Sequence, residues 1–406
     1  MAAHQHNPGV IVAGAGPVGL AAAVALADQG IPVTVLESEP QLQHDLRAGT
    51  FHPPTMEMLA PYGVTATMLE QGIKVPLWQV RDRKEGVIAE WDMSVMSDIT
   101  PYPFRLHLEQ HKLARIIVDK LATYPHAKVM FGAALSGIEQ DDTGVRATIT
   151  QNGEEIVLTA DWLIGADGGR SFTRKAIATE FEGFTWPERF AVISTDYDLA
   201  QHGYAMNAYI ADPTEWVAVF CVPHNGPPGL WRAVFPIANA DQPDEEVLSD
   251  KETQARLRGF MPWQDRYHVP YSSIYRVHQR VAKDWRVNRV LLAGDAAHVN
   301  NPLGAFGLNG GLHDAMNLAE KLGQVWRKEA DVSLLDRYVR QRRTTNIEFV
   351  QANSIRNKRM LEETDPAVRA QRFDELRAQA SDPKSALPFL MQSSMIMSLR
   401  RAAEIE

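Results

Sequence analysis

Residues 10–37 read VIVAGAGPVGLAAAVALADQGIPVTVLE and indicate the class of fold. The apolar run at 10–13 predicts a buried strand, and residues 14–19 follow it with the glycine spacing G-x-G-x-x-G. The Ala-rich segment 20–29 predicts a helix, and residues 31–36 predict a second buried strand. A strand, a glycine loop, a helix and a second strand in this order are typical of a dinucleotide-binding unit. The sequence therefore predicts an α/β fold that binds a nucleotide at the start of its first helix.

The glycines and the acid of this segment have separate physical roles in that prediction. Gly14 permits a tight turn, Gly16 lets the backbone approach a pyrophosphate, and Gly19 allows close packing of helix and strand. The free N–H groups at the helix start, together with the helix dipole, attract phosphates. Glu37 follows the second strand and is expected to accept hydrogen bonds from both hydroxyls of a ribose. The predicted nucleotide contacts in this segment are Gly14, Gly16, Pro17, Val18, Gly19 and Glu37.

Composition and charge exclude several classes of function. The chain has 406 residues, enough for two or three domains of roughly 100–200 residues each. Its net charge of −9 argues against binding to the phosphate backbone of nucleic acids. Residues 10–27 are uncharged and long enough to suggest a membrane span, but glycines and a proline interrupt them and no Lys or Arg precedes them. The single cysteine, Cys221, and the lack of an export signal lead us to expect the reducing cytoplasm.

A second glycine-rich loop follows a predicted hairpin. Residues 145–159 alternate on both sides of an Asn-Gly turn, and a strand at 163–164 leads into GADGGRS at 165–171. Asp167 in this loop is a candidate ligand-binding carboxylate. An acid near Arg174 could equally form a salt-bridged structural turn, so both interpretations stay open at this point.

A third glycine-rich segment completes the pattern. A buried strand is predicted at 290–293, and Gly-Asp at 294–295 lies at its carboxyl end, where α/β sheets bind their ligands. The glycine-rich stretch 304–311 then leads into a helix predicted at 313–322. A second helix N-terminus is therefore expected to point into the same cleft as the first.

Together the three motifs resemble those of the group A flavoprotein aromatic hydroxylases, single-component FAD-dependent monooxygenases. The resemblance extends over residues 8–345 and includes Pro302 and Asn309 after the third motif. It implies an α/β fold in which a Rossmann-like FAD-binding domain is interrupted by an antiparallel β-sheet substrate domain and followed by a helical C-terminus. The implied limits are 1–75, 100–180 and 285–345 for the FAD-binding domain, 76–99 and 181–284 for the substrate domain, and 346–406 for the helical segment.

The resemblance also implies cofactor roles, residue by residue. Glu37 would hold the adenosine ribose, and Asp295 would bond a ribityl hydroxyl. Arg47 would contact the FAD between its pyrophosphate and flavin, Gln110 would lie near the ribityl chain and phosphate, and Asp167 would serve both FAD and pyridine-nucleotide binding. The amides that would face the flavin pyrimidine edge are those of Gly307, Leu308 and Asn309.

The activity implied by the resemblance is hydroxylation of a phenolic or hydroxypyridine-type ring through a C4a-hydroperoxyflavin, with NADH or NADPH and O₂ as co-substrates. Pro302 would lie beside flavin and substrate. Such chemistry needs a site that excludes water, positions the ring and favours a phenolate-like donor. No metal is expected. A flavin halogenase, an FAD-dependent reductase and a non-catalytic FAD-fold binding protein stay open as alternatives, although the halogenase motif Trp-x-Trp-x-Ile-Pro is missing and all three flavin motifs are intact.

The substrate region carries weaker signals. Four segments rich in aromatic and β-branched residues predict antiparallel strands, namely 190–198, 204–211, 215–223 and 231–237. Alternation puts Arg232 on the face opposite to Trp231 and Ala233, without indicating which face lines the cleft. Four residues could deprotonate a phenol or hold a carboxylate, or could equally be ordinary surface or core residues: Tyr209, His224, Arg232 and Tyr271. The expected partners are a small aromatic substrate and O₂, and a homodimer stays open.

Overall fold

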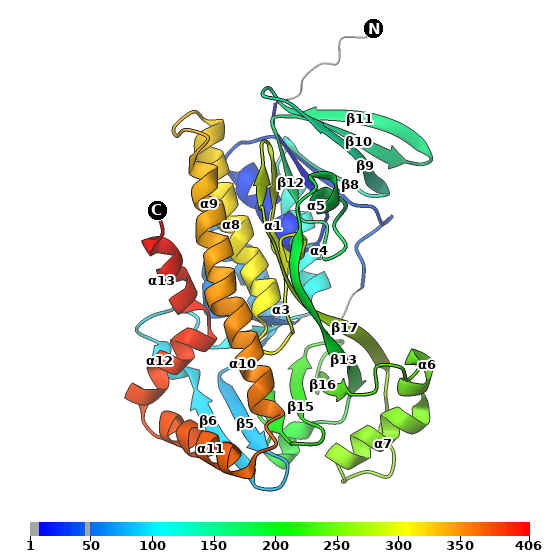
Figure 1. The fold of residues 1–406 in the computed structure, drawn as a ribbon, viewed down its shortest axis with the longest axis vertical. Coiled ribbons are helices and arrows are strands. Elements are labelled where there is room, and N and C mark those ends of the chain that lie inside the picture. Colours follow the sequence, from blue (N-terminus) through cyan, green and yellow to red (C-terminus); the bar gives the residue numbers. More distant parts are fainter. Residues whose placement is uncertain (1–7, 45–48) are drawn as a thin grey trace.

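The computed structural model describes residues 8–44 and 49–406 and contains two large sheets toward opposite ends of the molecule (Figure 1). The first sheet has six strands in the order β18-β19-β12-β1-β2-β8, all parallel except the β18–β19 pair. In that order the strands are Arg286–Val287, Val290–Leu292, Trp162–Gly165, Val10–Ala13, Val33–Leu36 and Ala127–Met130. The strand that precedes the first glycine loop, β1, therefore lies inside the sheet, as predicted for a dinucleotide-binding unit.

Strand β1 is apolar at every position because both of its faces are covered. Val10 and Val12 pack with the helices, whereas Ile11 packs with a three-stranded sheet on the other side. The turn between two strands of this three-stranded sheet has φ values of 53° at Asn152 and 82° at Gly153, which confirms the predicted Asn-Gly hairpin. The covering helices are α1 (Pro17–Asp28), α4 (Gln110–Leu121) and α8 (Phe306–Trp326). The strands of the small sheet are β9 (Ala133–Gln140), β10 (Val145–Gln151) and β11 (Glu154–Ala160).

The second large sheet has eight strands in the order β20-β17-β13-β16-β15-β14-β5-β6. In that order they are His298–Val299, Tyr271–Ala282, Phe181–Thr195, Leu230–Ile237, Val217–Val222, Asn207–Ala211, Leu77–Asp82 and Gly86–Asp92. Strand β13 begins at 181 instead of the predicted 190, and β14 begins at 207 instead of 204 because a 3₁₀ helix, Leu199–His202, ends just before it. The hairpin β5–β6 lies in this sheet, in agreement with grouping 76–99 with 181–284, although the domain limits stay a prediction.

The two faces of the eight-stranded sheet pack against different parts of the chain. Trp231 and Cys221 belong to the face that packs against α7 (Asp250–Phe260). Phe220 and Arg232 are paired across β15 and β16 on the opposite face. That face clusters with C-terminal helices and with Leu303, which precedes α8. The face that alternation left undecided is therefore the one that carries Arg232 and is turned toward the start of α8.

A second three-stranded sheet, the fourth sheet of the structure, connects the two large ones. Its strands are β3 (Thr50–Phe51), β7 (Arg105–His107) and β4 (Ile73–Val75). Helices α2 (Pro53–Leu59) and α3 (Val64–Gln71) follow β3. The His107 ring of β7 contacts Phe220 of the eight-stranded sheet, with ring centroids 6.1 Å apart. This sheet therefore brings residues near 50 and 105 to the inner face of the substrate region.

The C-terminus is helical, as predicted, and covers the inner face of the eight-stranded sheet. In Figure 1, α9 lies beside α8, α11 and α12 lie close to β5 and β6, and α13 returns toward α9. Leu361, Leu390 and Met391 of these helices form one apolar cluster with Trp78 of β5. The C-terminal helices are α9 (Leu334–Thr345), α10 (Ala352–Leu361), α11 (Pro366–Ala380), α12 (Pro383–Ser393) and α13 (Ile396–Glu404), with a π-helix at Asn346–Gln351.

The remaining short helices lie in connections between these elements. They are α5 (Phe172–Ala176), α6 (Asp244–Val247) and the 3₁₀ helices Ala60–Tyr62, Met93–Met96 and Gly294–Ala296. Within residues 8–44 and 49–406, none of the helices has the length and apolar composition needed to cross a membrane. The uncharged stretch 10–27 is divided between β1 and α1.

Candidate cofactor and substrate site

Loops at the carboxyl ends of β1, β12 and β19 border a cavity of about 500 Å³. All three sequence motifs therefore meet at one edge of the parallel sheet, where α/β proteins bind their ligands. The predicted cofactor residues that line this cavity are Gly14, Gly16, Pro17, Val18, Glu37, Gln110, Asp167, Asp295 and Leu308. Their common position favours one extended ligand, and their individual roles stay predictions.

The three glycines of the first loop have the environments that a bound pyrophosphate requires. Gly14 has φ +104°, and a Cβ there would lie 2.4 Å from the Ala166 carbonyl oxygen. A Cβ on Gly19 would lie 2.1 Å from the Gly14 carbonyl oxygen, so only glycine allows α1 to pack this closely. A Cβ on Gly16 would meet nothing within 4 Å. The loop is therefore tight on its protein side and open at Gly16, which fits the pyrophosphate of FAD.

Glu37 is held at the cavity wall by backbone amides. Its Oε2 accepts a hydrogen bond from Ala15 N at 2.9 Å, and its Oε1 accepts one from Glu39 N at 3.0 Å. Because a carboxylate has further acceptor positions, these bonds orient the group without exhausting it. This arrangement fits the predicted contact with ribose hydroxyls.

Asp167 serves the local structure of its loop and also lines the cavity. Its carboxylate accepts hydrogen bonds from Ser171 Oγ at 2.5 Å, Thr173 N at 2.9 Å and Thr173 Oγ1 at 3.0 Å. The side chain of Arg174 donates instead to the carbonyls of Ala296 and Gly169. The structural interpretation of this loop is thus correct in part, but the turn is held by hydroxyls and an amide and not by a salt bridge.

The first turn of α8 borders the same cavity. Ala305, with φ 56°, reverses the chain before the helix, and Leu308 reaches the cavity wall. The amides of this turn, including that of Gly307, have no partner within the helix and are available to an acceptor. The Asn309 side chain is engaged elsewhere, since it accepts from His52 N at 2.9 Å and donates to Thr50 O at 2.9 Å.

A buried ionic group supports the loop after β19 from below. Asp314 of α8 accepts hydrogen bonds from Gly294 N at 3.1 Å, Arg342 Nε at 2.7 Å and His298 Nε2 at 2.8 Å. His298 stacks on Trp285, with ring centroids 5.3 Å apart. His298 is therefore a structural residue beneath the Gly-Asp loop.

Two of the predicted substrate residues lie together on the inner sheet face. Tyr209 and Arg232 are buried, and the Arg232 guanidinium lies 5.2 Å from the Phe220 ring centroid. Burial raises the pKa of Tyr209, while Arg105 and a hydrogen bond to the Gly304 backbone oppose the rise. Tyr209 therefore reaches the loop that leads into α8.

The other predicted residues lie differently. His224 is on an exposed turn, where its backbone N–H donates to Glu109 Oε1 at 2.7 Å. Tyr271, at the start of β17, is 37% exposed. Pro302 is exposed in the loop before α8, and Arg47 lies outside the described residues. The structure thus gives no support to His224 and Tyr271 as pocket residues, and both stay untested predictions.

The sequence reasoning missed three buried residues on β7 and just after β3, close to the inner sheet face. Arg105 is buried, and His52 Nε2 donates to the Gly304 carbonyl at 2.9 Å. His107 Nδ1 donates to the Cys221 carbonyl at 2.7 Å, and burial lowers the pKa of this imidazole to about 4. The only sequence signal was the alternation Arg-Leu-His at 105–107, which predicts two polar side chains on one face of a short strand.

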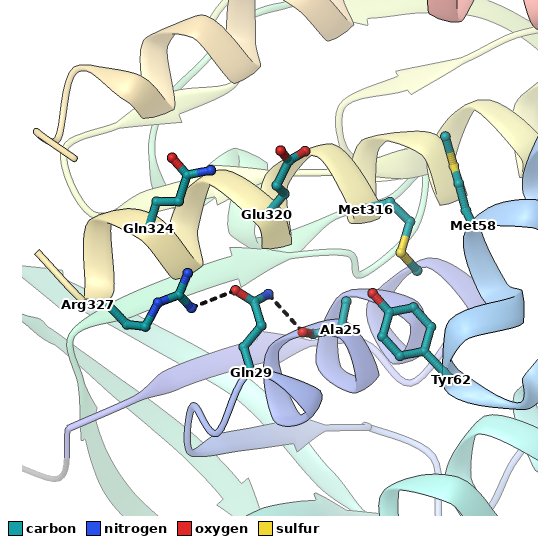
Figure 2. Close-up of a pocket in the computed structure, with 8 residues that line it drawn as sticks. All are labelled: Ala25, Gln29, Met58, Tyr62, Met316, Glu320, Gln324 and Arg327. Atoms are coloured by element: carbon teal, nitrogen blue, oxygen red, sulfur yellow. Dashed lines mark hydrogen bonds between the residues drawn. The ribbon is translucent and has the colours of Figure 1, made fainter. Parts of the chain in front are cut away.

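A second cavity, of about 390 Å³, lies between α1 and α8, away from these residues (Figure 2). Gln29 lines this cavity; its side chain donates a hydrogen bond to the Ala25 carbonyl at 2.9 Å and accepts one from Arg327 at 2.9 Å. None of the predicted site residues lines this cavity. In the part of the chain that the structure describes, no group of three or more His, Cys, Asp or Glu residues is arranged to hold a metal ion.

Comparison with known proteins agrees with this geometry. The profile of the family described as FAD binding domain matches residues 8–353. Para-nitrophenol 4-monooxygenase of Pseudomonas sp. strain WBC-3 is 36% identical over 368 residues, which cover 89% of each chain. 6-Hydroxy-3-succinoylpyridine 3-monooxygenase of Pseudomonas putida strain S16 is 34% identical over 360 residues, 88% of this chain and 90% of the relative. The crystal structure of p-nitrophenol 4-monooxygenase from Pseudomonas putida DLL-E4 superposes with a TM-score of 0.91 at 33% identity, covering 98% of each chain.

The chain therefore belongs to the FAD-binding family of group A flavoprotein aromatic hydroxylases. It is an FAD-dependent aromatic monooxygenase, and the predicted fold class, cofactor and type of activity are confirmed.

Proposed function

We propose that this chain uses NADH or NADPH and O₂ to hydroxylate a small phenol or hydroxypyridine bound between the eight-stranded sheet and the loop before α8. The observation that carries this proposal is that Leu303 of that loop packs in one buried cluster with Tyr209 of β14. This contact joins the aromatic inner face of the substrate region to the loop before α8. The first turn of α8, at Leu308, borders the cofactor cavity.

Within this proposal the chain binds and orients the cofactor. Glu37 holds the ribose, Asp295 and Gln110 hold the ribityl and phosphate portion, and Arg47 keeps its predicted contact. The amides of Gly307, Leu308 and Asn309 favour negative charge on the flavin pyrimidine edge, because the helix N-terminus carries partial positive charge. FAD, when bound, supplies the redox chemistry by which electrons of the nicotinamide activate O₂.

The substrate part of the site excludes water and positions the ring. The inner face is buried by C-terminal helices, and its aromatic lining includes Phe220 and Tyr275. Exclusion of water strengthens every electrostatic interaction inside the pocket. Pro302 would lie beside the ring, and Tyr209 and Arg232 would contact its polar substituents. The division into a discontinuous FAD-binding domain and a substrate domain, with the predicted limits, belongs to the same proposal.

The names of the relatives suggest the first substrates to test. Two of them are para-nitrophenol 4-monooxygenases, and one is a 6-hydroxy-3-succinoylpyridine 3-monooxygenase. We therefore propose 4-nitrophenol and a 6-hydroxypyridine with an acidic side chain as representatives of the two substrate classes. Both are flat rings with an ionisable hydroxyl and an acidic or strongly polar substituent.

Oxidation of NADH and NADPH by the purified holoenzyme, with O₂ uptake followed in parallel, tests the proposal. We expect one compound of a phenol and hydroxypyridine panel to accelerate oxidation many-fold and to be hydroxylated itself. If the flavin is reduced but no compound of the panel accelerates oxidation, the proposed substrate classes are wrong.

We also propose a cytoplasmic location. Whether the protein forms a homodimer stays open and is to be tested. Cys221, the single cysteine, is buried, and burial raises the pKa of its thiol to about 12. Such a thiol forms no disulfide and reacts poorly, which is compatible with a reducing compartment. Cell fractionation tests the location, and light scattering of the holoenzyme tests the oligomeric state.

A further inference from the structure

Arg105 is a buried cation without an acidic partner among the described residues. It lies on β7, is 3% exposed, and makes its hydrogen bond to the Asn207 side chain of β14. Its guanidinium lies 4.6 Å from the centroid of the Trp78 ring. Its Nε atom is buried and has no hydrogen-bond partner. Asn207 and Trp78 therefore fix the orientation of the guanidinium and leave part of its donor capacity unused.

Two other buried arginines of this chain have carboxylate partners. Arg342 pairs with Asp314 at 2.7 Å, and Arg189 pairs with Asp244. A buried charge without a counter-charge is costly, and natural proteins seldom retain one unless it has a function. Burial lowers the pKa of Arg105 to about 10, which still leaves it charged at neutral pH. An anionic ligand would supply the missing counter-charge.

The other titratable groups that face Arg105 offer no negative charge. Burial lowers the pKa of His52 and of His107, so both imidazoles are neutral at neutral pH. Burial raises the pKa of Tyr209 and of Tyr275, so both phenols keep their protons. Two carboxylates of the strands that form this face already have cationic partners, since Asp82 pairs with Arg369 and Glu188 pairs with Lys358. Arg232 of β16 lies on the same face and is a second cation. None of these groups therefore supplies Arg105 with a free negative charge at neutral pH.

The position of Arg105 connects it to the reacting end of the cleft. Tyr209, whose pKa Arg105 lowers, packs in one buried cluster with Leu303, the residue before Gly304. His52, which Arg105 also affects, donates to the carbonyl of the same Gly304. These two residues place the guanidinium close to the loop that precedes α8. A ligand held by Arg105 would lie under that loop, on the inner face of the sheet.

We propose that Arg105, oriented by Asn207 and Trp78, is the specificity-determining residue that binds an anionic oxygen of the aromatic substrate. This inference rests on the proposed function and names the form of substrate that the site accepts. The oxygen belongs either to the ionised ring hydroxyl or to an acidic ring substituent. In the first case the same contact retains the electron-rich phenolate form, which is the better donor toward an electrophilic oxygen.

Binding titrations of the holoenzyme without nicotinamide test this inference. The probes are 4-nitrophenol against its methyl ether, for a ring oxyanion, and 4-hydroxybenzoate against its methyl ester, for an acidic substituent. Binding is followed through the flavin absorbance. The variants are Arg105→Met, which keeps the length of the side chain without its charge, and Arg105→Lys, which keeps the charge without the planar fork. Arg276→Met, on the exposed side of β17, is the matched control.

We expect wild type and Arg276→Met to bind the anion of one pair more tightly than its neutral ester or ether, and Arg105→Met to lose this preference. The expected loss is roughly 10- to 100-fold in Kd for the anion, with little change for the neutral compound. Arg105→Lys should retain part of the preference. If the ring oxyanion is bound, the affinity of wild type for 4-nitrophenol should rise as pH rises through the pKa of the phenol, and that of Arg105→Met should not.

The outcomes separate the two claims. If an aromatic compound is hydroxylated but Arg105→Met retains the wild-type preference, the role of Arg105 is wrong and the proposed function stands. If wild type binds none of the probes and no panel compound accelerates NAD(P)H oxidation, both the role of Arg105 and the proposed function are wrong. FAD content and thermal unfolding establish that each variant is folded. Should Arg105→Met fail to fold, Arg105→Lys and Asn207→Leu replace it, and unchanged anion preference in both overturns the inference.

Discussion

Arg105 donates a hydrogen bond to Asn207, and this contact joins the small β3–β7–β4 sheet to the eight-stranded sheet. The two residues are 102 positions apart in the chain. Because β3 also leads directly into His52, which donates to Gly304, the contact connects the substrate face to the loop before α8. Buried hydrogen bonds between the sheets thus fix the position of the substrate face relative to the cofactor cavity.

The first glycine loop allows a contrast between two substitutions of the same size. Gly16→Ala should leave the thermal stability of the apoprotein near that of wild type, because a Cβ there meets nothing within 4 Å. It should nevertheless weaken FAD binding roughly 10-fold or more, because the methyl group occupies the approach of the pyrophosphate. Gly19→Ala should instead lower stability by about 2 kcal/mol or more, because its Cβ would lie 2.1 Å from the Gly14 carbonyl oxygen. Thermal unfolding and FAD titration check both; equal destabilisation by the two variants contradicts the interpretation.

Glu37→Gln should weaken FAD binding by about 1–3 kcal/mol, because a charged hydrogen bond to the ribose is lost. Glu39→Gln, two residues further on, serves as the control for a change of charge at the same surface. Its carboxylate bonds to Gln43 and does not line the cavity. Titration of the apoproteins with FAD, followed by flavin fluorescence, measures the difference. Equal affinities of the two variants would remove Glu37 from the ribose site.

Asp295→Ala should release FAD during purification. Asp295 is exposed at the cavity wall, in the turn that Asp314 supports through Gly294. Loss of the ribityl contact is expected to cost on the order of 10- to 100-fold in affinity. The ratio of flavin to protein absorbance after gel filtration reports the retention. A variant that keeps its full FAD content and activity contradicts the assignment.

Arg232→Ala should raise KM for acidic aromatic substrates with a smaller effect on kcat. Its buried guanidinium lies over Phe220 on the inner face, where it adds positive charge near the substrate. Steady-state kinetics with an acidic substrate and its neutral analogue separate loss of binding from loss of fold. Arg232→Lys, which keeps the charge, should fall between wild type and Arg232→Ala. Unchanged KM values across the acidic substrates would exclude Arg232 from the pocket.

The free energy of unfolding should fall as the pH is lowered from about 6.5 toward 3, in part because of His313. Burial lowers the pKa of this imidazole from 6.5 to about 3, so in this window the unfolded chain binds a proton that the folded chain does not. The lowered pKa therefore costs about 1.4 kcal/mol of stability for each pH unit below 6.5. In His313→Gln the free energy of unfolding should depend less steeply on pH, by about 1.4 kcal/mol for each pH unit, because one fewer proton is bound on unfolding. Urea unfolding at pH 7 and 5 measures it, and an unchanged slope refutes the assignment.

Prediction from sequence succeeded where the signal was local. The strand at 10–13, the tight turn at Gly14, the close packing at Gly19 and the hairpin at 152–153 were all correctly anticipated. Backbone geometry within one turn or one strand determines such patterns, so that a short window contains the information. The substrate face was harder, because alternation separates two faces of a strand without telling which of them is turned inward.

The chemistry of the substrate pocket depends on contacts between distant segments. Arg105 and Asn207 are 102 residues apart, and His52 and Gly304 are 252 residues apart. In the sequence Arg105 is one arginine among many, and it becomes a candidate anion site only because folding buries it against Trp78 and away from every described carboxylate. Glycine spacing and apolar periodicity were sufficient for the cofactor fold, since both act over a few neighbouring residues. Long-range packing alone created the uncompensated positive charge, since burial and pairing are properties of the folded chain.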